Sequence, residues 1–600
     1  MHEFGIPALI EVPDDAGLAD VVFSRAAADP SEVMLRRRSA GAWEDVTAGQ
    51  FHAEVAGLAK GLIAAGIQPG DRVALLSRTR YEWTLADYAI WAAGAVIVPV
   101  YETSSAEQVE WIVGDSGARA VIAETDQHAG IIDSLRNRLS DVSLVWRISG
   151  LDELAATGAD VTDDQLRQRR ASRQASDLAT IIYTSGTTGR PKGCELTHRN
   201  LLSAVRNAVH GALPELFEVP GGSTLLFMPL AHVFARIIEV GCLESGVVLG
   251  HWADIGSVAE GLREFSPTFL LAVPRVFEKV YNTAQQQASA SSAKSKIFSA
   301  AAATAIAYSE GAVTGRPGPG LQVRHALFDR LVYGKLRAAV GGRVTYAISG
   351  GAPLGERLGH FFRGVGITVL EGYGMTETSA AATVNKPSRN KVGTVGQPLP
   401  GVSAKIADDG EILLRGGIIF AGYWQNDAAT KEVLDGDGWL HTGDLGSLDD
   451  EGFLRVTGRK KELIVTAGGK NVAPAVLEDR LRAHPLISQV MVVGDNRPFI
   501  SCLITLDPEA LAHWNQQHGK PADATPADMG TDPDLLAEIQ AAVDDANKAV
   551  SRAESIRKFV ILPIDFTTDN GYITPSLKVK RAVVAKDFAA DIEALYTRQH

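Results

Sequence analysis

Cysteine is scarce in this chain of 600 residues, which contains only Cys194, Cys242 and Cys502. Three widely separated cysteines are too few for a disulfide framework or a cysteine-based zinc site. The scarcity agrees with a reducing compartment, and we therefore expect a cytoplasmic protein. Peripheral contact with the inner face of a membrane stays open at this point.

Positive charge and long apolar runs are lacking as well. The chain has 58 Lys and Arg against 71 Asp and Glu, a net charge of -13, which argues against nonspecific binding of nucleic acid. Residues 1–15 hold neither the basic segment nor the apolar core of a secretion signal. The longest apolar candidate, 88–100, falls short of the roughly 20 residues that span a bilayer. We predict instead a buried helix that runs through Gly94 into a strand.

The length exceeds what one hydrophobic core supports, so about two to four domains are expected. Up to about residue 460, short strand-like runs alternate with amphipathic helical stretches. Each run is expected to be followed by a turn and a helix, as in βα units on a parallel sheet. The runs are 72–77, 118–124, 178–185, 268–273, 344–349 and 367–374.

The pattern changes twice further along the chain. Between about 391 and 457, short strands and Gly/Asp turns predict an antiparallel or barrel-like module, and a smaller mixed region follows. We expect one domain over 1–458 and a second over 459–600. The Ala/Ser/Gln-rich segment 282–311 has good helix propensity and no feature that indicates chemistry. We interpret it as a helical insertion that extends to about residue 320.

A loop rich in glycine and hydroxyl side chains begins where the third strand-like run ends. Residues 181–193 read IIYTSGTTGRPKG, and such a loop offers backbone amides to an anion, most often phosphate. Lys192 falls in register with the lysine of a Walker A motif, but Pro191 replaces its second glycine and Gly193 its Ser or Thr. Proline also removes an amide that a phosphate cradle would use. We expect a phosphate-binding loop that differs from that of P-loop NTPases.

Further motifs complete the pattern. Segments 348–354 (ISGGAPL) and 371–378 (EGYGMTET) follow predicted strands, so both should lie at the carboxyl edge of a sheet, where open α/β sheets bind ligands. Segments 438–446 (GWLHTGDLG) and 458–474 (GRKKELIVTAGGKNVAP) lie near the expected domain junction, and 571–581 (GYITPSLKVKR) lies near the end of the chain. With the loop, they define a set of motifs spread over most of the sequence.

In order and content these motifs resemble those of the adenylate-forming superfamily, which comprises acyl-CoA synthetases, luciferases and nonribosomal adenylation domains. Segments 228–236 (MPLAHVFAR), 272–281 (AVPRVFEKVY) and 467–474 (AGGKNVAP) are similar to the long-chain fatty acyl-CoA synthetase branch. The insertion is similar to one that this branch carries at the same place. The resemblance covers nearly the whole chain.

The resemblance implies an α/β fold. It consists of a large N-terminal domain of two doubly wound α/β subdomains plus a small β-barrel-like module, followed by a smaller, mobile α+β C-terminal domain. It also implies a reaction in two steps, in which a fatty acid and ATP give an acyl-adenylate and pyrophosphate, and coenzyme A then gives acyl-CoA and AMP. The expected partners are therefore a fatty acid, ATP with Mg²⁺, and coenzyme A.

The family's glycine- and hydroxyl-rich loop is a mobile clasp for the β- and γ-phosphates of ATP. Glycines let the backbone approach oxygen atoms closely. Thr187 and Glu377 are expected to hold Mg²⁺, which prefers oxygen ligands. For Glu377 alone, the more common role would be to cap the amides at a helix start. The residues that the resemblance assigns to the clasp are Thr184, Ser185, Gly186, Thr187, Thr188, Gly189 and Lys192.

The nucleotide itself is expected to contact three other motifs. Tyr373 stacks on adenine, Thr376 lies near the α-phosphate, and small residues leave room for the ring. Asp444 accepts hydrogen bonds from the two ribose hydroxyls with the help of Arg459. The alternative is that this Asp only stabilises its turn, which is the usual role of Asp in a turn flanked by glycines. The small residues expected around the nucleotide are Gly351, Ala352, Gly372 and Gly374.

The remaining expected roles are catalytic or conformational. Lys578 reaches the α-phosphate and the attacking carboxylate during adenylation, and Lys580 is the neighbour to be excluded, because relatives often read Ser-Gly-Lys where this chain has Ser-Leu-Lys. His232 positions the substrate without acting as a base, against the alternative of a buried structural histidine. Lys461 marks the pivot of the C-terminal domain. Gly468 and Gly469 admit the pantetheine arm.

Other functions remain open at this stage. The nearest is a fatty acyl-AMP ligase that delivers the adenylate to a carrier protein, and a synthetase for another carboxylic acid is a second. A kinase or NTPase would release ADP, and a non-catalytic scaffold would carry the motifs as relics. The sequence identifies neither the preferred acyl chain length nor the oligomeric state.

Overall fold

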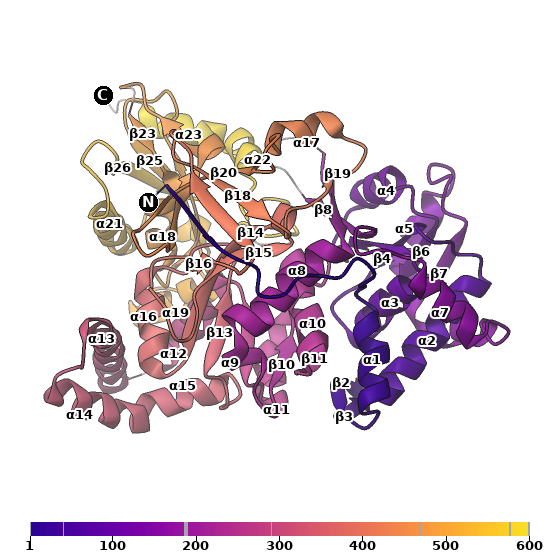
Figure 1. The fold of residues 1–600 in the computed structure, drawn as a ribbon. Helices are drawn as coiled ribbons and strands as arrows, with labels where there is room; N and C mark the ends of the chain where they lie inside the picture. Colours follow the sequence, from indigo (N-terminus) through magenta and orange to yellow (C-terminus); the bar gives the residue numbers. More distant parts are fainter. Residues whose placement is uncertain are drawn as a thin grey trace.

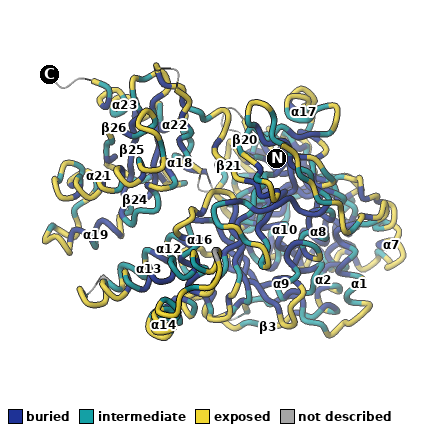
Figure 2. The backbone as a smooth tube through the Cα atoms, turned by 60° about the vertical axis from the view of Figure 1, so that its left-hand side comes forward, coloured by how far each residue is buried: buried dark blue, intermediate teal, exposed yellow. Residues whose placement is uncertain are grey.

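The computed structural model describes residues 2–39, 41–184, 190–289, 291–468, 470–574 and 578–597. Figure 1 shows a large body formed by the first three quarters of the chain, with the C-terminal residues in a smaller lobe against one side. Dark, buried segments concentrate in the large body, and the lobe has a core of its own (Figure 2). No helix among the described residues is long and apolar enough to cross a membrane.

A seven-stranded sheet organises the first part of the chain, in the order β19-β9-β8-β5-β4-β6-β7. The four strands β5, β4, β6 and β7 are parallel to one another, and β8 joins β5 in the same direction. The predicted helix and strand around Gly94 are confirmed as the buried helix α3 (Tyr81–Ala92) and β5. The strands are β4 (Arg72–Leu76), β5 (Val96–Val100), β6 (Ala120–Ala123), β7 (Leu144–Arg147), β8 (Leu178–Thr184), β9 (Lys192–Thr197) and β19 (Gly422–Tyr423).

Two further sheets lie side by side in the middle of the body. One has the order β10-β11-β2-β3 and the other β12-β13-β14-β15-β16, and the amide of Thr268 donates to the carbonyl of Ser223 between them. Their strands are β2 (Val33–Ser39), β3 (Ala42–Thr47), β10 (Ser223–Leu226), β11 (Val248–His251), β12 (Phe269–Ala272), β13 (Tyr346–Ser349), β14 (Thr368–Met375), β15 (Ala380–Val384) and β16 (Gln397–Pro398).

All six strand-like runs are strands, but two of the predicted connections are wrong. β8 and β14 were expected to lead into helices, whereas each turns back into an antiparallel partner, β9 and β15 respectively. Part of the motif at 371–378 consequently belongs to β14 itself instead of following it. The short apolar runs predict strands, but their periodicity does not specify the direction of the next element.

The expected antiparallel module is present as a sheet in the order β1-β17-β18-β20-β21. Its four later strands come from the region where short strands were predicted. The first strand, β1, comes from the N-terminus and pairs antiparallel with β17, which the sequence pattern did not indicate. The strands are β1 (Glu3–Ile6), β17 (Val402–Ile406), β18 (Glu411–Gly416), β20 (Leu440–Leu448) and β21 (Leu454–Arg459).

The C-terminal lobe packs helices on a three-stranded sheet. Two arginines of the large body reach it: Nη2 of Arg275 lies 3.4 Å from Oδ2 of Asp507, and Nη2 of Arg357 donates to the carbonyl of Ala483 at 3.0 Å. These contacts hold the lobe against α12 (Pro274–Ser289) and α16 (Glu356–Val365). Its elements include α18 (Pro474–Arg482), β24 (Ile487–Val493), β25 (Ile500–Leu506), α19 (Pro508–Gln517), α21 (Pro533–Asn547), β26 (Ile556–Ile561), α22 (Arg581–Asp587) and α23 (Ala589–Tyr596).

The Ala/Ser/Gln-rich segment is helical, as predicted, but it is divided between two helices. α12 (Pro274–Ser289) ends before the division and α13 (Ser292–Thr314) begins after it. α13 packs against α16 (Glu356–Val365), and α14 (Pro319–Phe328) and α15 (Gly334–Ala339) follow at the lower left of Figure 1.

Candidate active site

A cavity of about 2340 Å³ lies between the large body and the C-terminal lobe. It is bordered by the ends of β8, β9 and β14, by the loop after β13, by β20 and β21, and by the segment that precedes α22. The predicted motifs, which are far apart in the sequence, therefore meet at one place. The predicted site residues that line the cavity are Thr184, Lys192, His232, Gly351, Ala352, Gly372, Tyr373, Gly374, Thr376, Glu377, Asp444, Arg459, Lys461 and Lys578.

Two groups of predicted residues are not found there. Ser185, Gly186, Thr187, Thr188, Gly189 and Gly469 lie outside the residues that the structure describes. Gly468 is described and exposed, but it does not line the cavity.

The predicted phosphate loop connects the paired ends of β8 and β9, where Thr184 stands opposite Lys192. The indole Nε1 of Trp111 donates to the carbonyl of Pro191 at 2.8 Å and fixes the end of the loop. Nζ of Lys192 lies 4.9 Å from the ring centroid of Tyr423, a cation–π contact. The ammonium group is thus held at the cavity wall.

The end of β14 is shaped by glycine. The register of β14 against β15 shifts between Tyr373 and Gly374, and a Cβ at Gly374 would overlap the carbonyl oxygen of Ala380. A larger residue there would push the two strands apart. The following turn buries Glu377, whose Oε1 accepts a hydrogen bond of 2.7 Å from the hydroxyl of Tyr423.

A hydrogen-bonded chain crosses from β14 to the antiparallel sheet. The hydroxyl of Tyr373 donates to Oδ2 of Asp444 at 2.7 Å, and Nε of Arg459 lies 3.2 Å from Oδ1 of the same carboxylate. Asp444 and Arg459 stand opposite each other on β20 and β21, so the pairing of these strands brings their side chains together. Burial, with the charge of Asp444, raises the pKa of Tyr373 well above its usual value. The phenol therefore remains a hydrogen-bond donor at neutral pH.

The loop after β13 carries two of the predicted small residues. Gly351 has a φ of +83°, which favours glycine, and the next residue, Ala352, is exposed to the cavity. The amide of Leu354 donates to Oε2 of Glu371 at 3.0 Å, which ties this loop to β14. Burial raises the pKa of Glu371 to about 7.

His232 lies at the start of α10 (Val233–Ser245). Its Nδ1 accepts a hydrogen bond of 3.1 Å from the amide of Phe234, so the proton of the neutral ring is on Nε2. Burial, and to a smaller extent the charge of Lys578, lowers the pKa of His232 to about 4. The ring is consequently neutral at physiological pH, where it can donate a hydrogen bond but is a weak base.

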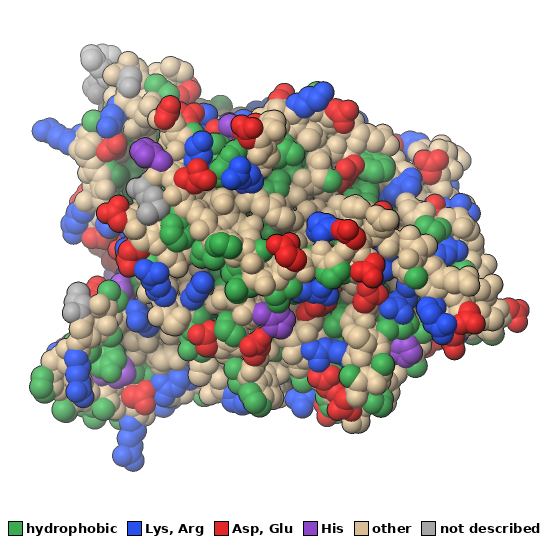
Figure 3. Space-filling model, viewed as in Figure 1, with side chains coloured by type: hydrophobic (Ala, Val, Ile, Leu, Met, Phe, Trp, Pro, Cys, Tyr) green, Lys and Arg blue, Asp and Glu red, His purple; other side chains and the backbone are tan. Residues whose placement is uncertain are grey.

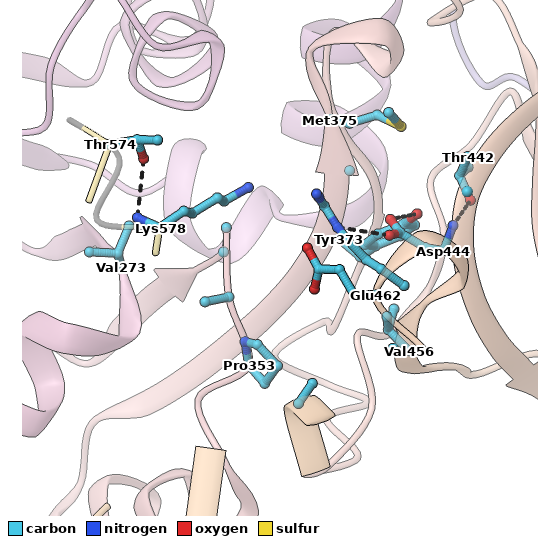
Figure 4. Close-up of a pocket in the computed structure, with 18 of the residues that line it drawn as sticks. Val273, Pro353, Tyr373, Met375, Thr442, Asp444, Val456, Glu462, Thr574 and Lys578 are labelled. Atoms are coloured by element: carbon cyan, nitrogen blue, oxygen red, sulfur yellow. Dashed lines mark hydrogen bonds and ion pairs between the residues drawn. The ribbon is translucent and has the colours of Figure 1, made fainter. Parts of the chain in front are cut away.

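Lys578 reaches the cavity from the C-terminal lobe. The amide of Thr574 donates to the carbonyl of Lys578 at 2.8 Å, and the amide of Lys578 donates to the threonine hydroxyl at 3.1 Å. Figure 4 shows the side chain extended toward Tyr373 and Glu462. The backbone bonds thus orient the lysine into the cavity.

Lys578 lies among charged groups of the large body and of the turn that follows β21. The Lys578 side chain can be reached from the cavity. The protein groups around it nevertheless displace much of its water, and this desolvation lowers its pKa. Arg459 lowers the pKa further, whereas the carboxylates of Asp444, Glu462 and Glu377 oppose the shift. The lysine therefore lies among the residues that were predicted to bind nucleotide and metal.

Sequence reasoning missed an apolar arm of the same cavity. The arm runs between α8 (His198–Asn207), the π-helical turn Ala208–Ala212, α9 (Pro214–Phe217) and α10. On α10 it is bordered by residues three to four positions apart, which share one helix face. Nothing in the sequence distinguishes these side chains from core. The lining residues are Ala204, Val205, Ala208, Val209, Leu213, Phe217, Val233, Phe234, Ile237, Ile238 and Gly241.

Tyr423 and Trp111 were also missed, although both support the predicted phosphate loop. The only signal for Tyr423 was a pair of aromatic residues after a glycine, in a region assigned to another module. β19 carries Tyr423 into the seven-stranded sheet next to β9, which the sequence did not indicate.

Comparisons with known proteins match most of the chain. The family model described as "AMP-binding enzyme" matches residues 22–424, and "AMP-binding enzyme C-terminal domain" matches 461–600. A long-chain-fatty-acid–CoA ligase, FadD15 of Mycobacterium bovis, is 53% identical over 604 residues, which is 100% of both chains. The long-chain-fatty-acid–CoA ligase ACSBG2 of Xenopus laevis is 32% identical over 94% of this chain and 81% of its own.

Among solved structures, the fold is similar to that of the A domain of a carboxylic acid reductase from Segniliparus rugosus, solved with AMP and a co-purified carboxylic acid. The TM-score is 0.73 at 22% identity, over 97% of this chain and 94% of that one. At this identity the likeness establishes the fold alone.

Proposed function

The chain belongs to the AMP-binding enzyme family, and from this premise we propose that it is an ATP-dependent long-chain fatty acid–CoA ligase. The observation that carries the proposal is that one cavity joins the predicted nucleotide residues to an apolar arm. The polar part suits ATP, and the arm suits a hydrocarbon chain, because each buried methylene contributes about 0.8 kcal/mol.

The reaction has two steps in which atoms balance. A carboxylate oxygen of the fatty acid attacks the α-phosphorus of ATP, the bond to the β-phosphate oxygen breaks, and pyrophosphate leaves. The thiol of coenzyme A then loses its proton and attacks the acyl carbon, and AMP leaves with the bridging oxygen. The first step brings together two anions that repel each other, the fatty acid carboxylate and the triphosphate, so positive charge near the α-phosphate should accelerate it.

Lys578 and His232 are proposed to act on the reacting groups. The Lys578 ammonium enters the cavity beside the groups of Asp444 and Glu377, which supports a contact with the α-phosphate and the substrate carboxylate. His232 begins the helix that borders the apolar arm, and its pKa of about 4 supports the positioning of substrate by a neutral ring.

The nucleotide is proposed to bind across β14 and β20. Asp444, already held by Tyr373 and Arg459, has the paired oxygens that a ribose diol requires. Tyr373 is proposed to offer its ring to adenine. Thr376 begins the turn Thr376–Thr378 at the cavity wall, which supports its proposed contact with the α-phosphate. The small residues Gly351, Ala352, Gly372 and Gly374 leave the space that an adenine ring and its phosphates need.

The phosphates of ATP are proposed to lie against the β8–β9 loop. Thr184 and Lys192 stand at the two ends of this loop, and both border the cavity. We extend the phosphate-binding role to the residues between them, Ser185, Gly186, Thr187, Thr188 and Gly189.

Mg²⁺ is proposed to accompany ATP. Among the described residues, no group of three or more His, Cys, Asp and Glu is placed to hold a metal ion. Glu377 nevertheless fits, because Mg²⁺ is commonly held by one or two carboxylates together with substrate phosphates and water. The carboxylate is buried at the cavity wall, and Tyr423 orients one of its oxygens. Bound there with Thr187, the ion would neutralise phosphate charge.

The domains are proposed to divide between residues 458 and 459, with a C-terminal domain that moves between the two steps. Lys461 lies in the single turn Lys460–Glu462 directly after β21, where a pivot would join the two parts. Gly468 lies away from the cavity in this arrangement, which supports a second arrangement in which Gly468 and Gly469 admit the pantetheine arm.

Gly241, on the wall of the apolar arm, is predicted to limit the length of the acyl chain that binds there. A Cβ on Gly241 would lie 3.3 Å from Cε1 of Phe217 and 3.6 Å from Cγ2 of Val209. Gly241→Leu should therefore close the arm there, while leaving its mouth beside His232 open. If about four methylenes lose their site, the lost stabilisation is roughly 3 kcal/mol, and kcat/KM for palmitate should fall about a hundredfold relative to octanoate.

Kinetics of the Gly241→Leu variant with both acids test this assignment. Activity with octanoate near that of the unmodified protein is the control for folding. An equal loss with both acids would show that Gly241 does not border the bound chain.

The proposed function itself is tested with a panel of free acids of increasing length, each with ATP and with or without coenzyme A. Formation of AMP and an acyl-CoA thioester with long-chain acids is expected. Accumulation of acyl-adenylate that coenzyme A does not convert would identify an acyl-AMP ligase, and preference for a short or aromatic acid would change the substrate class.

A further inference from the structure

The segment 291–340 forms a helical arm, made of α13, α14, a π-helical turn (Asp329–Tyr333) and α15. The inner side of α13 contributes Phe298, Ala301 and Ala305 to a core that includes residues of α12 and α16. α14 packs against α13, yet this helix, every residue of which the structure describes, buries none of its own residues. The arm thus has a covered inner face and an open outer face.

The outer face carries an apolar stripe of Val323, Leu327 and Leu331. Their exposed fractions are 72%, 56% and 49%, although aliphatic side chains of this size are usually buried. Residues four positions apart lie on one side of a helix, and the stripe extends over roughly 12 Å. Val313, 57% exposed, adds to the apolar surface of the arm. Exposed aliphatic side chains gathered in this way mark an interaction surface.

Basic residues accompany the apolar stripe. The helical arm has seven Lys and Arg and two Asp and Glu, a net charge of +5, whereas the whole chain carries -13. One of the two acidic residues, Asp329, is neutralised by Arg337 at 2.6 Å. Arg316, Arg330 and Lys335 are exposed on the same helical arm. Green and blue side chains accordingly gather at the lower left of Figure 3, over α13 to α15, with few red ones.

We propose that the outer face of the helical arm docks on the surface of an anionic lipid bilayer. Helices with exposed apolar residues flanked by Lys and Arg lie in the interface of a membrane, where aliphatic side chains enter the boundary of the acyl chains and basic groups contact lipid phosphates. A projecting helix presents such a face to a flat surface. Self-association through this face would bring two patches of positive charge together, which is unfavourable.

This surface adds a role that the fatty acid–CoA ligase reaction does not require. A fatty acid partitions into bilayers, so docking would hold the enzyme where its proposed substrate accumulates. The docking argument depends on the residues of the helical arm alone, and its test measures no enzymatic activity.

Sedimentation of the full-length protein with vesicles tests the proposal. The protein should bind vesicles of phosphatidylcholine mixed with phosphatidylglycerol, and bind weakly to phosphatidylcholine alone. Added salt should weaken the binding, because the charges are exposed. Replacing Arg316, Arg330 or Lys335 by Gln should reduce the partition coefficient about fivefold for each residue. The triple variant Val323→Glu, Leu327→Glu, Leu331→Glu should lose binding by about tenfold or more.

A matched triple variant controls for added negative charge. Leu9, Val219 and Ile564 are also large and exposed, at 63%, 43% and 41%, and lie outside the helical arm. Their replacement by Glu should leave vesicle binding nearly unchanged. Loss of binding in both triple variants alike, or no binding to anionic vesicles at low salt, would overturn the proposal. So would a dimer in analytical ultracentrifugation that dissociates only in the stripe variant, since the stripe would then be a self-association surface.

Discussion

Lys578→Ala should reduce adenylate formation from fatty acid and ATP about a thousandfold. The ammonium group extends into the cavity among Asp444, Glu462 and Glu377. A unit charge about 4 Å from the reacting phosphate, at an effective dielectric constant of about 20, contributes roughly 4 kcal/mol. At about 1.36 kcal/mol per tenfold change in rate, this corresponds to three orders of magnitude. Pyrophosphate release in a single-turnover experiment measures the effect.

The same variant should retain the second step. Supplied with preformed acyl-adenylate and coenzyme A, Lys578→Ala is expected to form thioester at nearly the normal rate. Lys580→Ala is the matched control, because it removes the same charge two residues away and should adenylate normally. If Lys580→Ala alone showed the adenylation defect, the assignment of the catalytic lysine would be wrong by two residues.

Lys461→Pro should have the opposite effect on the two steps. Proline fixes φ near −65°, which agrees with the helical turn Lys460–Glu462 in this arrangement but restricts rotation away from it. Adenylation should continue, and thioester formation should stop. An equal loss of both steps in Lys578→Ala and Lys461→Pro, with folding verified, would contradict a mechanism that uses two arrangements of the C-terminal lobe.

Glu377→Gln should lower kcat/KM for ATP about a hundredfold, the usual loss when one electrostatic contact to a reacting group is removed. Glutamine preserves the volume of the side chain, and its carbonyl oxygen can still accept from the hydroxyl of Tyr423. The fold should therefore remain intact while the anionic ligand for Mg²⁺ is lost.

Titration calorimetry of ATP binding at several Mg²⁺ concentrations separates the metal role from a structural one. In Glu377→Gln the affinity for ATP should depend much less on Mg²⁺. Tyr423→Phe is the control, since it keeps the ring beneath Lys192 and removes only the hydrogen bond to Glu377. An unchanged Mg²⁺ dependence in Glu377→Gln would exclude Glu377 as a ligand.

Local sequence patterns predicted the elements of the fold better than their connections. Apolar runs located β4, β8 and β14, because a buried strand requires such a run wherever it pairs. Pairing partners are set by packing at a distance, so the return of β8 into β9 and the addition of β1 to β17 were not predicted. Both motif-bearing strands turn back into antiparallel partners, and the described ends of these strands line the cavity.

The polar part of the site was predictable because its chemistry limits the choice of residue. A carboxylate at Asp444 or a glycine at Gly374 stands in a recognisable motif, and the structure brings these residues to one cavity. The apolar arm was not predictable, since Val209 and Phe217 belong to the main hydrophobic core as well as to the cavity wall. Any aliphatic or aromatic residue of suitable size serves both purposes.

Quantifying every product of one reaction tests the central claim most directly. The purified protein is incubated with ATP, Mg²⁺, palmitate and coenzyme A, and nucleotides, pyrophosphate and thioester are separated and measured. The account predicts equal amounts of AMP, pyrophosphate and palmitoyl-CoA, and none of them when palmitate is omitted. ADP as the stoichiometric product, or AMP formed without thioester in the presence of coenzyme A, would contradict it.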